Sequence, residues 1–352
     1  MTEIKSGTQA AILPSADAGW LALRTEAILE PDLPIIDPHH HLWALPRQPL
    51  YLAEELQRDA QAGHNLIGTV FADCTEGYRV EGPENMRPVG ETEFVTAIAE
   101  KAQAGLYSPP GLCAGIISYA DLREGAGVQA VLEAHIAAGK GRFKGIRQST
   151  SWDPHPEIRT TARTPPEGLL CDRTLREGFA ALAPLGLTFD SWVYHHQLSD
   201  VADLASAFPD TSIILDHVGG PIGIGPYAGR RDEIFPLWKA GILEIARRPN
   251  VTVKLGGLAM KVSGFGFHER PMPPSSDDLA AAWRPYIETC IEAFGADRAM
   301  FESNFPVDQL SCSYVVLWNA FKRLAAGCSS DEKAALFSRT AARVYSIKHV
   351  LS

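Results

Sequence analysis

The fold and the site are decided by one stretch of the sequence, Ile35-Ile36-Asp37-Pro38-His39-His40-His41-Leu42-Trp43. It begins as a short apolar run, which is typical of a strand buried on both faces, and it ends in three histidines. Alternate side chains of an extended chain point to the same side, so His39 and His41 are expected to face one side and His40 the other. Neutral imidazole binds zinc and similar ions, and it can also contact a carbonyl oxygen. The alternative is a polar loop with capping histidines. Three adjacent histidines at the end of a strand make this interpretation the less favoured one.

Seven more strand-like runs follow, and amphipathic stretches separate most of them. Such alternation predicts βαβ units and a parallel sheet, and eight units predict an α/β fold of the (β/α)8 TIM-barrel type. The expected strands are Leu33–Asp37, Leu66–Ala72, Leu112–Ser118, Phe143–Arg147, Thr188–Val193, Ser212–Leu215, Val251–Leu255 and Ala299–Ser303.

An open doubly wound sheet is the main alternative fold. It usually carries a glycine-rich phosphate turn after its first strand, whereas three histidines stand there in this chain. The glycine pairs Gly219-Gly220 and Gly256-Gly257 come after late strands and lack the G-x-G-x-x-G spacing. A closed barrel is therefore favoured.

Composition excludes several classes of function. The net charge of −10 disfavours a nucleic-acid partner. The sequence has no apolar run of membrane-spanning length and no secretory signal, and its six cysteines form no C-x-x-C pair, so a cytoplasmic protein without membrane contact is expected. We expect residues 1–19 to be a flexible N-terminal arm and residues 20–352 to form a single barrel domain.

Further histidines follow the fifth and sixth expected strands. His195 and His196 follow the fifth, and His217 follows the sixth in Asp216-His217-Val218-Gly219. Each alone is as consistent with a structural histidine as with a site residue. Together with the first histidines they form a constellation, because a closed barrel brings its strand ends around one mouth. Which of His195 and His196 faces the site stays open.

Two cations lie at or within expected strands and indicate an anionic substrate. Arg147 ends the fourth strand, where it could bind a carboxylate with two hydrogen bonds. Lys254 lies inside the apolar seventh strand, where its charge is costly unless paired. The alternative for Lys254 is a structural ion pair with Asp190 or Glu302.

Two aromatic residues near strand ends, Trp43 and Tyr194, are candidates for an apolar wall of the substrate site. Such residues are more often simply part of the core.

Three motifs in this order resemble the amidohydrolase-related branch of the amidohydrolase superfamily, from about Leu33 to Tyr345. They are Asp37-x-His39-x-His41, Asp216-His217-Val218-Gly219 and Phe301-Glu302-Ser303-Asn304-Phe305-Pro306. The chain is most similar to the subgroup of sugar-acid lactonases and 2-pyrone-4,6-dicarboxylate lactonase. The resemblance implies an amidohydrolase-like TIM barrel. It also implies one divalent metal, often zinc, held by the H-x-H pair, a strand-five histidine and a strand-eight aspartate, although some lactonases of this kind use none.

The strand-eight motif departs from the family pattern, because Asn304 stands where the family has an aspartate. An amide carries no charge and cannot act as a base, although its carbonyl oxygen can coordinate weakly. Glu302 and Asp308 are the nearby carboxylates that could replace it. His39, His41, His195 and, weakly, Asn304 are thus the expected metal ligands for zinc or manganese, and a metal-free site stays open.

The leading functional hypothesis is a hydrolase that opens a lactone of a small carboxylated or hydroxylated compound by water attack. In it His39 and His41 polarise the carbonyl directly or through a metal, His217 or His195 is the base, and Asn304 orients water. Arg147, His195, Tyr194, Lys254 and Trp43 are the expected substrate contacts. Alternatives are a metal-dependent amide hydrolase or decarboxylase of the same superfamily, and a barrel that binds its ligand without turnover. A homodimer is left open.

Overall fold

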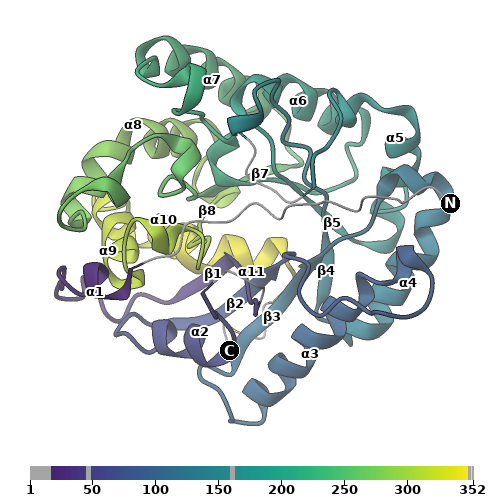
Figure 1. The fold of residues 1–352 in the computed structure, drawn as a ribbon, viewed down its shortest axis with the longest axis horizontal. Coiled ribbons are helices and arrows are strands. Elements are labelled where there is room, and N and C mark those ends of the chain that lie inside the picture. Colours follow the sequence, from purple (N-terminus) through teal and green to yellow (C-terminus); the bar gives the residue numbers. More distant parts are fainter. Residues whose placement is uncertain (1–16, 45–48, 159–162, 348–349, 351–352) are drawn as a thin grey trace, which may run out of the picture.

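The computed structural model describes residues 17–44, 49–158, 163–347 and 350. Eight parallel strands pair in sequence order, β1-β2-β3-β4-β5-β6-β7-β8, which confirms the predicted (β/α)8 barrel (Figure 1). The strands are β1 (Ile35–His40), β2 (Leu66–Ala72), β3 (Gly111–Ser118), β4 (Phe143–Arg147), β5 (Thr188–Ser191), β6 (Ile213–Leu215), β7 (Val251–Leu255) and β8 (Ala299–Phe301).

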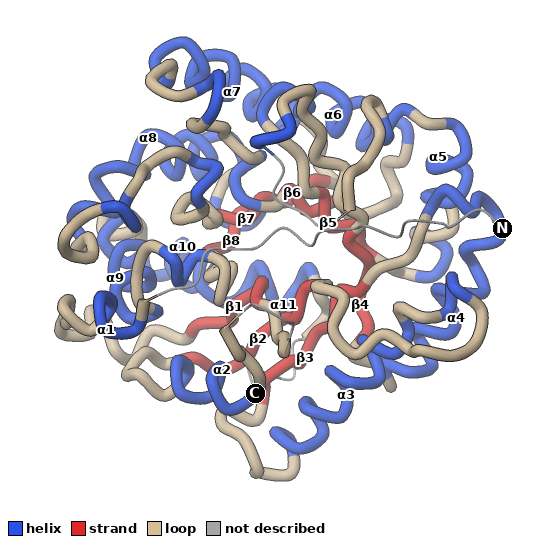
Figure 2. Tube along the Cα trace, viewed as in Figure 1, coloured by secondary structure: helices blue, strands red, loops and turns tan. Residues whose placement is uncertain are grey.

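Helices surround the strands on the outside, as the tube view shows (Figure 2). The helices that follow the strands are α2 (Ala53–Ala60), α3 (Val89–Gln103), α4 (Val128–Gly139), α5 (Arg173–Phe179), α6 (Leu198–Ala207), α7 (Arg231–Ala246), α8 (Ser276–Phe294) and α9 (Tyr314–Leu324). The short helix α1 (Ala18–Leu21) precedes the barrel, and α10 (Ser330–Ala334), a π-helical turn (Ala335–Arg339) and α11 (Thr340–Val344) end it.

The segment after β8 closes the barrel against β1. The backbone N–H of Asn304 donates to the carbonyl of His39 at 2.8 Å, and the N–H of His41 donates to the carbonyl of Phe305 at 2.7 Å. These two bonds bring the Glu302–Pro306 segment beside the H-x-H pair. They connect the first and last motifs of the sequence at one end of the barrel.

Asp37 strengthens the same closure from a buried position. Its Oδ1 accepts the backbone N–H of Ser303 at 2.9 Å, and its Oδ2 accepts the Tyr314 hydroxyl at 3.1 Å. Burial raises the pKa of Asp37 to about 6, although these hydrogen bonds act in the opposite direction. Asp37 thus connects β1 by hydrogen bonds to the segment after β8 and to α9.

The core has two main parts. The larger fills the space between the barrel and its helices, and the smaller lies inside the barrel. Inward side chains such as Ile36, Ile214 and Met300 meet the C-terminal residues Ala341 and Tyr345 there. The C-terminal segment therefore covers the inside of the barrel from the amino-terminal ends of the strands, opposite the histidines.

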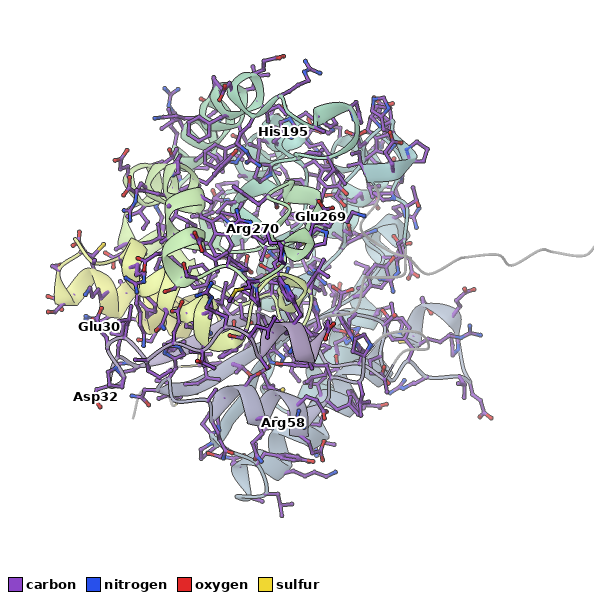
Figure 3. The ribbon with its side chains drawn as sticks, turned by 60° about the vertical axis from the view of Figure 1, so that its left-hand side comes forward. Glu30, Asp32, Arg58, His195, Glu269 and Arg270 are labelled. Atoms are coloured by element: carbon purple, nitrogen blue, oxygen red, sulfur yellow. The ribbon has the colours of Figure 1, made fainter. Side chains whose placement is uncertain are left out.

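The expected N-terminal arm lies outside the described residues up to position 16, and its last residues form the start of α1. Asp17 caps that helix, and Trp20 Nε1 donates to the carbonyl of Arg270 at 2.9 Å (Arg270 is labelled in Figure 3). Within the described part of the chain, no helix combines the length and the apolar character that crossing a membrane requires. The single-domain organisation stays a prediction.

Candidate active site

The three histidines at the end of β1 divide between two sides, as the strand alternation predicts. His40 points to the core, where its Nε2 lies 2.8 Å from Thr69 Oγ1. His39 and His41 face the other side, with their ring centroids 5.0 Å apart. His41 Nδ1 lies 2.9 Å from the carbonyl of Ala72, which can only accept, so Nδ1 carries the proton and Nε2 the lone pair.

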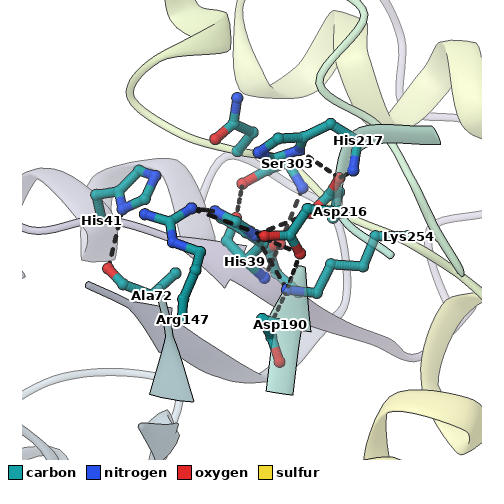
Figure 4. A network of polar contacts seen from close by, with 12 residues as sticks. His39, His41, Ala72, Arg147, Asp190, Asp216, His217, Lys254 and Ser303 are labelled. Atoms are coloured by element: carbon teal, nitrogen blue, oxygen red, sulfur yellow. Dashed lines mark hydrogen bonds and ion pairs between the residues drawn. The ribbon is translucent and has the colours of Figure 1, made fainter. Parts of the chain in front are cut away.

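His39 is held at both ring nitrogens, as the close-up shows (Figure 4). Its Nε2 lies 3.0 Å from an Arg147 N–H, and its Nδ1 lies 3.1 Å from Glu302 Oε2 and 3.0 Å from Lys254 Nζ. Arginine and lysine can only donate, so a cationic donor faces each ring nitrogen, while Glu302 Oε2 is a charged neighbour of Nδ1 without a hydrogen bond among the described residues. Burial, and then the Lys254 charge, hold the pKa of His39 well below its usual range, so its ring is neutral.

His217 and Glu302 form a histidine–carboxylate pair. His217 Nδ1 donates to Glu302 Oε1 at 2.7 Å, and the His217 backbone N–H donates to the same oxygen at 3.1 Å. Burial raises the pKa of Glu302, but His217 and then His39 outweigh it and hold that pKa at about 2. Glu302 is therefore ionised, and the ring of His217, which donates to it through Nδ1, lies beside the ring of His39 at 4.6 Å between centroids.

Two glycines after β7 make room for this pair. A Cβ at Gly256 would lie 2.4 Å from Glu302 Cγ, and a Cβ at Gly257 would lie 2.5 Å from His217 Cβ. Gly257 also has a φ of +69°, a left-handed conformation that favours glycine. These glycines therefore serve close packing at the site.

The substitution Gly257→Ala is expected to lower both stability and activity, because the new methyl group must displace His217. Gly229→Ala is the matched control, since Gly229 has a φ of +73° and no heavy atom within 4 Å of its ideal Cβ. The control should lose only the stability that a Cβ costs in a left-handed backbone conformation, roughly 1–2 kcal/mol. Thermal unfolding and kcat of both variants test this; equal losses in the two would contradict the steric explanation.

Lys254 is the centre of a buried charge cluster. Its Nζ lies 2.6 Å from Asp190 Oδ2 and 3.1 Å from Asp216 Oδ1, and none of the three side chains is exposed. Burial lowers the pKa of Lys254, but the two carboxylates outweigh it and raise that pKa above its usual value. The expected alternative for Lys254, a buried ion pair with Asp190, is thus present, and the same ammonium also contacts His39.

Arg147 stands at the end of β4 as expected, but much of its guanidinium is already used. Its Nε donates to Asp73 Oδ1 and its NH2 to the backbone carbonyl of Asp73, both at 2.5 Å. The NH1 group points to His39 and lies 3.9 Å from Asp216 Oδ2. The edge that was expected to hold a substrate carboxylate with two bonds therefore holds Asp73, and the role of Arg147 in substrate binding stays a prediction.

The side chains of Asn304 and Glu302 have different partners, although they stand two residues apart in the sequence. β8 ends at Phe301, and the left-handed backbone at Asn304 (φ 54°) turns its side chain to Asp308, whose Oδ1 accepts the amide N–H at 2.8 Å. Burial raises the pKa of Asp308 to about 7. Asn304 thus contacts His39 through its backbone, and its expected roles as a weak ligand and water-orienting group stay predictions.

The structure places His195 and Tyr194 beside loops at the strand ends, and their expected substrate contacts stay predictions. His195 (labelled in Figure 3) packs edge-on against the ring of Tyr227, at 5.5 Å between centroids, and burial, followed by the neighbouring His196, lowers its pKa to about 4. The Tyr194 hydroxyl donates to the carbonyl of Ile158 at 2.8 Å. These contacts join both residues to the loops after β4 and β6, and among the described contacts none links either of them to His39.

Trp43 packs against His41, and its expected contact with a substrate stays a prediction. Its ring stacks on His41 with the centroids 5.7 Å apart and an interplanar angle of 16°, and its Nε1 donates to the carbonyl of Pro49 at 3.0 Å. The sequence offered Glu302 as a replacement for the family aspartate, but it did not predict the contacts that Asp73, Asp216 and Glu302 make with Arg147, Lys254 and His217. Each acidic residue stands next to or within a strand-end motif, and this position indicates that the residue lies near the site. The partner that each carboxylate contacts depends on how the barrel closes.

One group of described residues has the donor atoms for a metal ion, namely His39, Asp216 and His217, whose ligand atoms lie within 4.8 Å of one another. His195 and Asn304 are not in this group, unlike the expected ligand set. The donor types suit zinc. However, Lys254 Nζ lies at 3.0 Å and 3.1 Å from two of the three donors, and Arg147 stands at the other nitrogen of His39. A metal bound through His39 would therefore have to displace a cation, so the residues as arranged do not fit it.

The family model described as "Amidohydrolase" matches residues 36–347. The chain belongs to the amidohydrolase family. This confirms the predicted superfamily and the prediction of a hydrolase. Among curated proteins, this amidohydrolase is 34% identical over 339 residues to an uncharacterized protein of Sinorhizobium fredii, covering 90% of this chain and 99% of that one. It is 26% identical over 328 residues to an L-fucono-1,5-lactonase of Burkholderia multivorans, covering 89% and 96%.

Solved structures support the fold of this amidohydrolase. A zinc-bound amidohydrolase from Burkholderia multivorans superposes with a TM-score of 0.67 at 23% identity, over 89% of this chain and 99% of that one. A putative 2-pyrone-4,6-dicarboxylic acid hydrolase from Pseudomonas putida has a TM-score of 0.59 at 18% identity, over 90% and 98%. A manganese complex of 5-carboxyvanillate decarboxylase from Novosphingobium aromaticivorans has a TM-score of 0.56 at 14% identity, over 90% and 97%.

Proposed function

We propose that this amidohydrolase opens a lactone of a small carboxylated or hydroxylated compound by attack of water. The observation that carries the proposal is the His217–Glu302 pair, whose imidazole lies beside His39, and His39 in turn contacts the cationic side chains of Arg147 and Lys254. The curated relatives named L-fucono-1,5-lactonase, at 26% and 23% identity, support the lactone as the substrate class.

His217 is the general base in this proposal. Its Nε2 takes a proton from water while the water oxygen attacks the lactone carbonyl carbon, and the ionised Glu302 stabilises the imidazolium that forms. When the tetrahedral intermediate collapses, the bond between the carbonyl carbon and the ring oxygen breaks. His217 returns the proton to that oxygen, so the products are one hydroxyl and one carboxylic acid, which ionises to a carboxylate by releasing the second water proton to solvent.

Arg147 supplies the charge that stabilises the developing oxyanion. Asp73 fixes its guanidinium at two atoms, so its remaining N–H groups are held in place before the substrate arrives. The anionic character of the substrate stays a prediction, because the edge of Arg147 that was expected to hold a carboxylate contacts Asp73. The neutral Nε2 of His41 is an acceptor, which suits a hydroxyl of the substrate rather than its carbonyl oxygen.

We infer that this reaction needs no metal, since Lys254 and Arg147 stand at the positions next to His39. The group of His39, Asp216 and His217 favours the second candidate, a metal-dependent amide hydrolase or decarboxylase of the same superfamily. The cytoplasmic location stays a prediction, as does the homodimer.

Elemental analysis of the purified protein and a lactone panel separate the two candidates. The panel contains sugar-acid lactones and a carboxylated pyrone, assayed before and after dialysis against a chelator. We expect a substoichiometric metal content and turnover that the chelator leaves unchanged. One zinc or manganese per chain, removed together with activity, would favour the second candidate, and binding without turnover would favour a barrel that has lost catalysis.

A further inference from the structure

Tyr345 reaches the charge cluster from the opposite end of the barrel. Its hydroxyl donates to Asp190 Oδ2 at 2.8 Å, and the same oxygen accepts from Lys254 Nζ at 2.6 Å. Lys254 Nζ also lies 5.6 Å from the centroid of the Tyr345 ring. Tyr345 is fully buried, so water cannot replace its hydroxyl without a change in the packing.

The C-terminal segment is shaped to bring this hydroxyl inward. A π-helical turn (Ala335–Arg339) interrupts the helix between α10 and α11, and such a turn rotates the residues that follow it. After it, Ala341, Ala342 and Tyr345 pack inside the barrel against Ile36 and other inward side chains. The apolar packing fixes the backbone, and the tyrosine carries the one polar group that this part of the segment directs at the cluster.

One atom, Lys254 Nζ, connects Asp190 with the residues of the candidate site. Lys254 Nζ contacts Asp190, Asp216 and His39 at 2.6, 3.1 and 3.0 Å. Among the described residues, Asp190 Oδ1 has no hydrogen-bond partner, so Oδ2 alone anchors the carboxylate, through Tyr345 and Lys254. Loss of the tyrosine hydroxyl would leave Lys254 as the only group that orients Asp190.

We propose that Tyr345 is a positioning residue of this enzyme, which holds Lys254 against His39 and Asp216 through Asp190. The inference rests on the proposed lactone hydrolysis. On this proposal the C-terminal segment supports the arrangement of the site from inside the barrel and is also part of the core. A tyrosine hydroxyl that served packing alone would not need to donate to the same oxygen that binds the ammonium.

The variant Tyr345→Phe tests this, because it removes one hydroxyl and keeps the ring. We expect kcat to fall about tenfold with an unchanged KM, since a hydrogen bond to a charged group is worth roughly that factor or more. Ile347→Val is the matched control: it trims the same buried segment without touching a polar group. It is expected to lower the melting temperature and leave kcat unchanged.

An unchanged kcat in Tyr345→Phe would overturn the inference, and so would an equal fall of kcat in Ile347→Val. If the unsubstituted enzyme opens no lactone, the proposed function fails, and crystal structures of both proteins decide the separate question of positioning. A Lys254 ammonium that moves away from His39 in Tyr345→Phe would support the role of Tyr345. An ammonium in the same place would refute it.

Discussion

Replacing His217 with alanine is expected to lower kcat for lactone opening by about 10²- to 10⁴-fold, the usual contribution of a general base. The reason is that no other described imidazole combines a free Nε2 with a carboxylate on Nδ1, since His41 uses a backbone carbonyl there. Initial rates with the best lactone of the panel measure the effect. Circular dichroism and thermal unfolding verify that the fold is kept.

Two more variants make this prediction sharper. His217→Gln keeps a donor for Glu302 but offers no base, so it should be as inactive as His217→Ala. Glu302→Gln should lose a comparable factor, because an amide no longer stabilises the imidazolium, and the double variant should be little worse than either single one. His135→Gln is the control: this histidine contacts Thr92 and the carbonyl of Tyr119, so its loss should cost stability and not kcat. Full activity of His217→Ala would exclude it as the base.

The sequence predicted the barrel because apolar runs mark strands that are buried on both faces. It was less accurate at strand ends, which hydrogen bonds to neighbouring strands decide. β1 extends to His40, since that residue still pairs with β2, whereas β5 stops at Ser191. Trp192 and Val193 are buried directly after the strand end, Trp192 among loop residues and Val193 in the main core, so burial alone could not separate them from the strand.

The sequence also placed His39, His41, His217, Arg147 and Lys254 at strand ends or within strands, and the barrel brings them together around one end. It did not predict which acid each of them contacts. Arg147 binds Asp73 and His217 binds Glu302 across one intervening strand, β3 and β7 respectively, so the closed barrel sets these distances. Asn304 turned away for a local reason, a left-handed backbone that strand alternation does not describe.

Replacing Lys254 with methionine is expected to destabilise the fold by about 3–5 kcal/mol, the usual cost of removing one partner of a buried ion pair. Methionine fills much of the same volume, so the loss comes mainly from Asp190 and Asp216, which would stay buried without their ammonium. Urea unfolding measures the loss. Lys140→Met is the control, because Lys140 pairs with Glu100 on the surface and such a pair is worth less than about 1 kcal/mol.

The pH dependence of this loss identifies its cause. Without the ammonium, burial raises the pKa values of Asp190 and Asp216 in the folded state above their unfolded values, so the folded variant binds protons more tightly. Its stability is therefore retained at low pH and lost as the pH rises through those raised values. The difference in unfolding free energy between the two proteins should be larger near neutral pH than near the ordinary carboxyl pKa of about 4. A difference that does not change with pH would mean that packing, and not charge, makes Lys254 important.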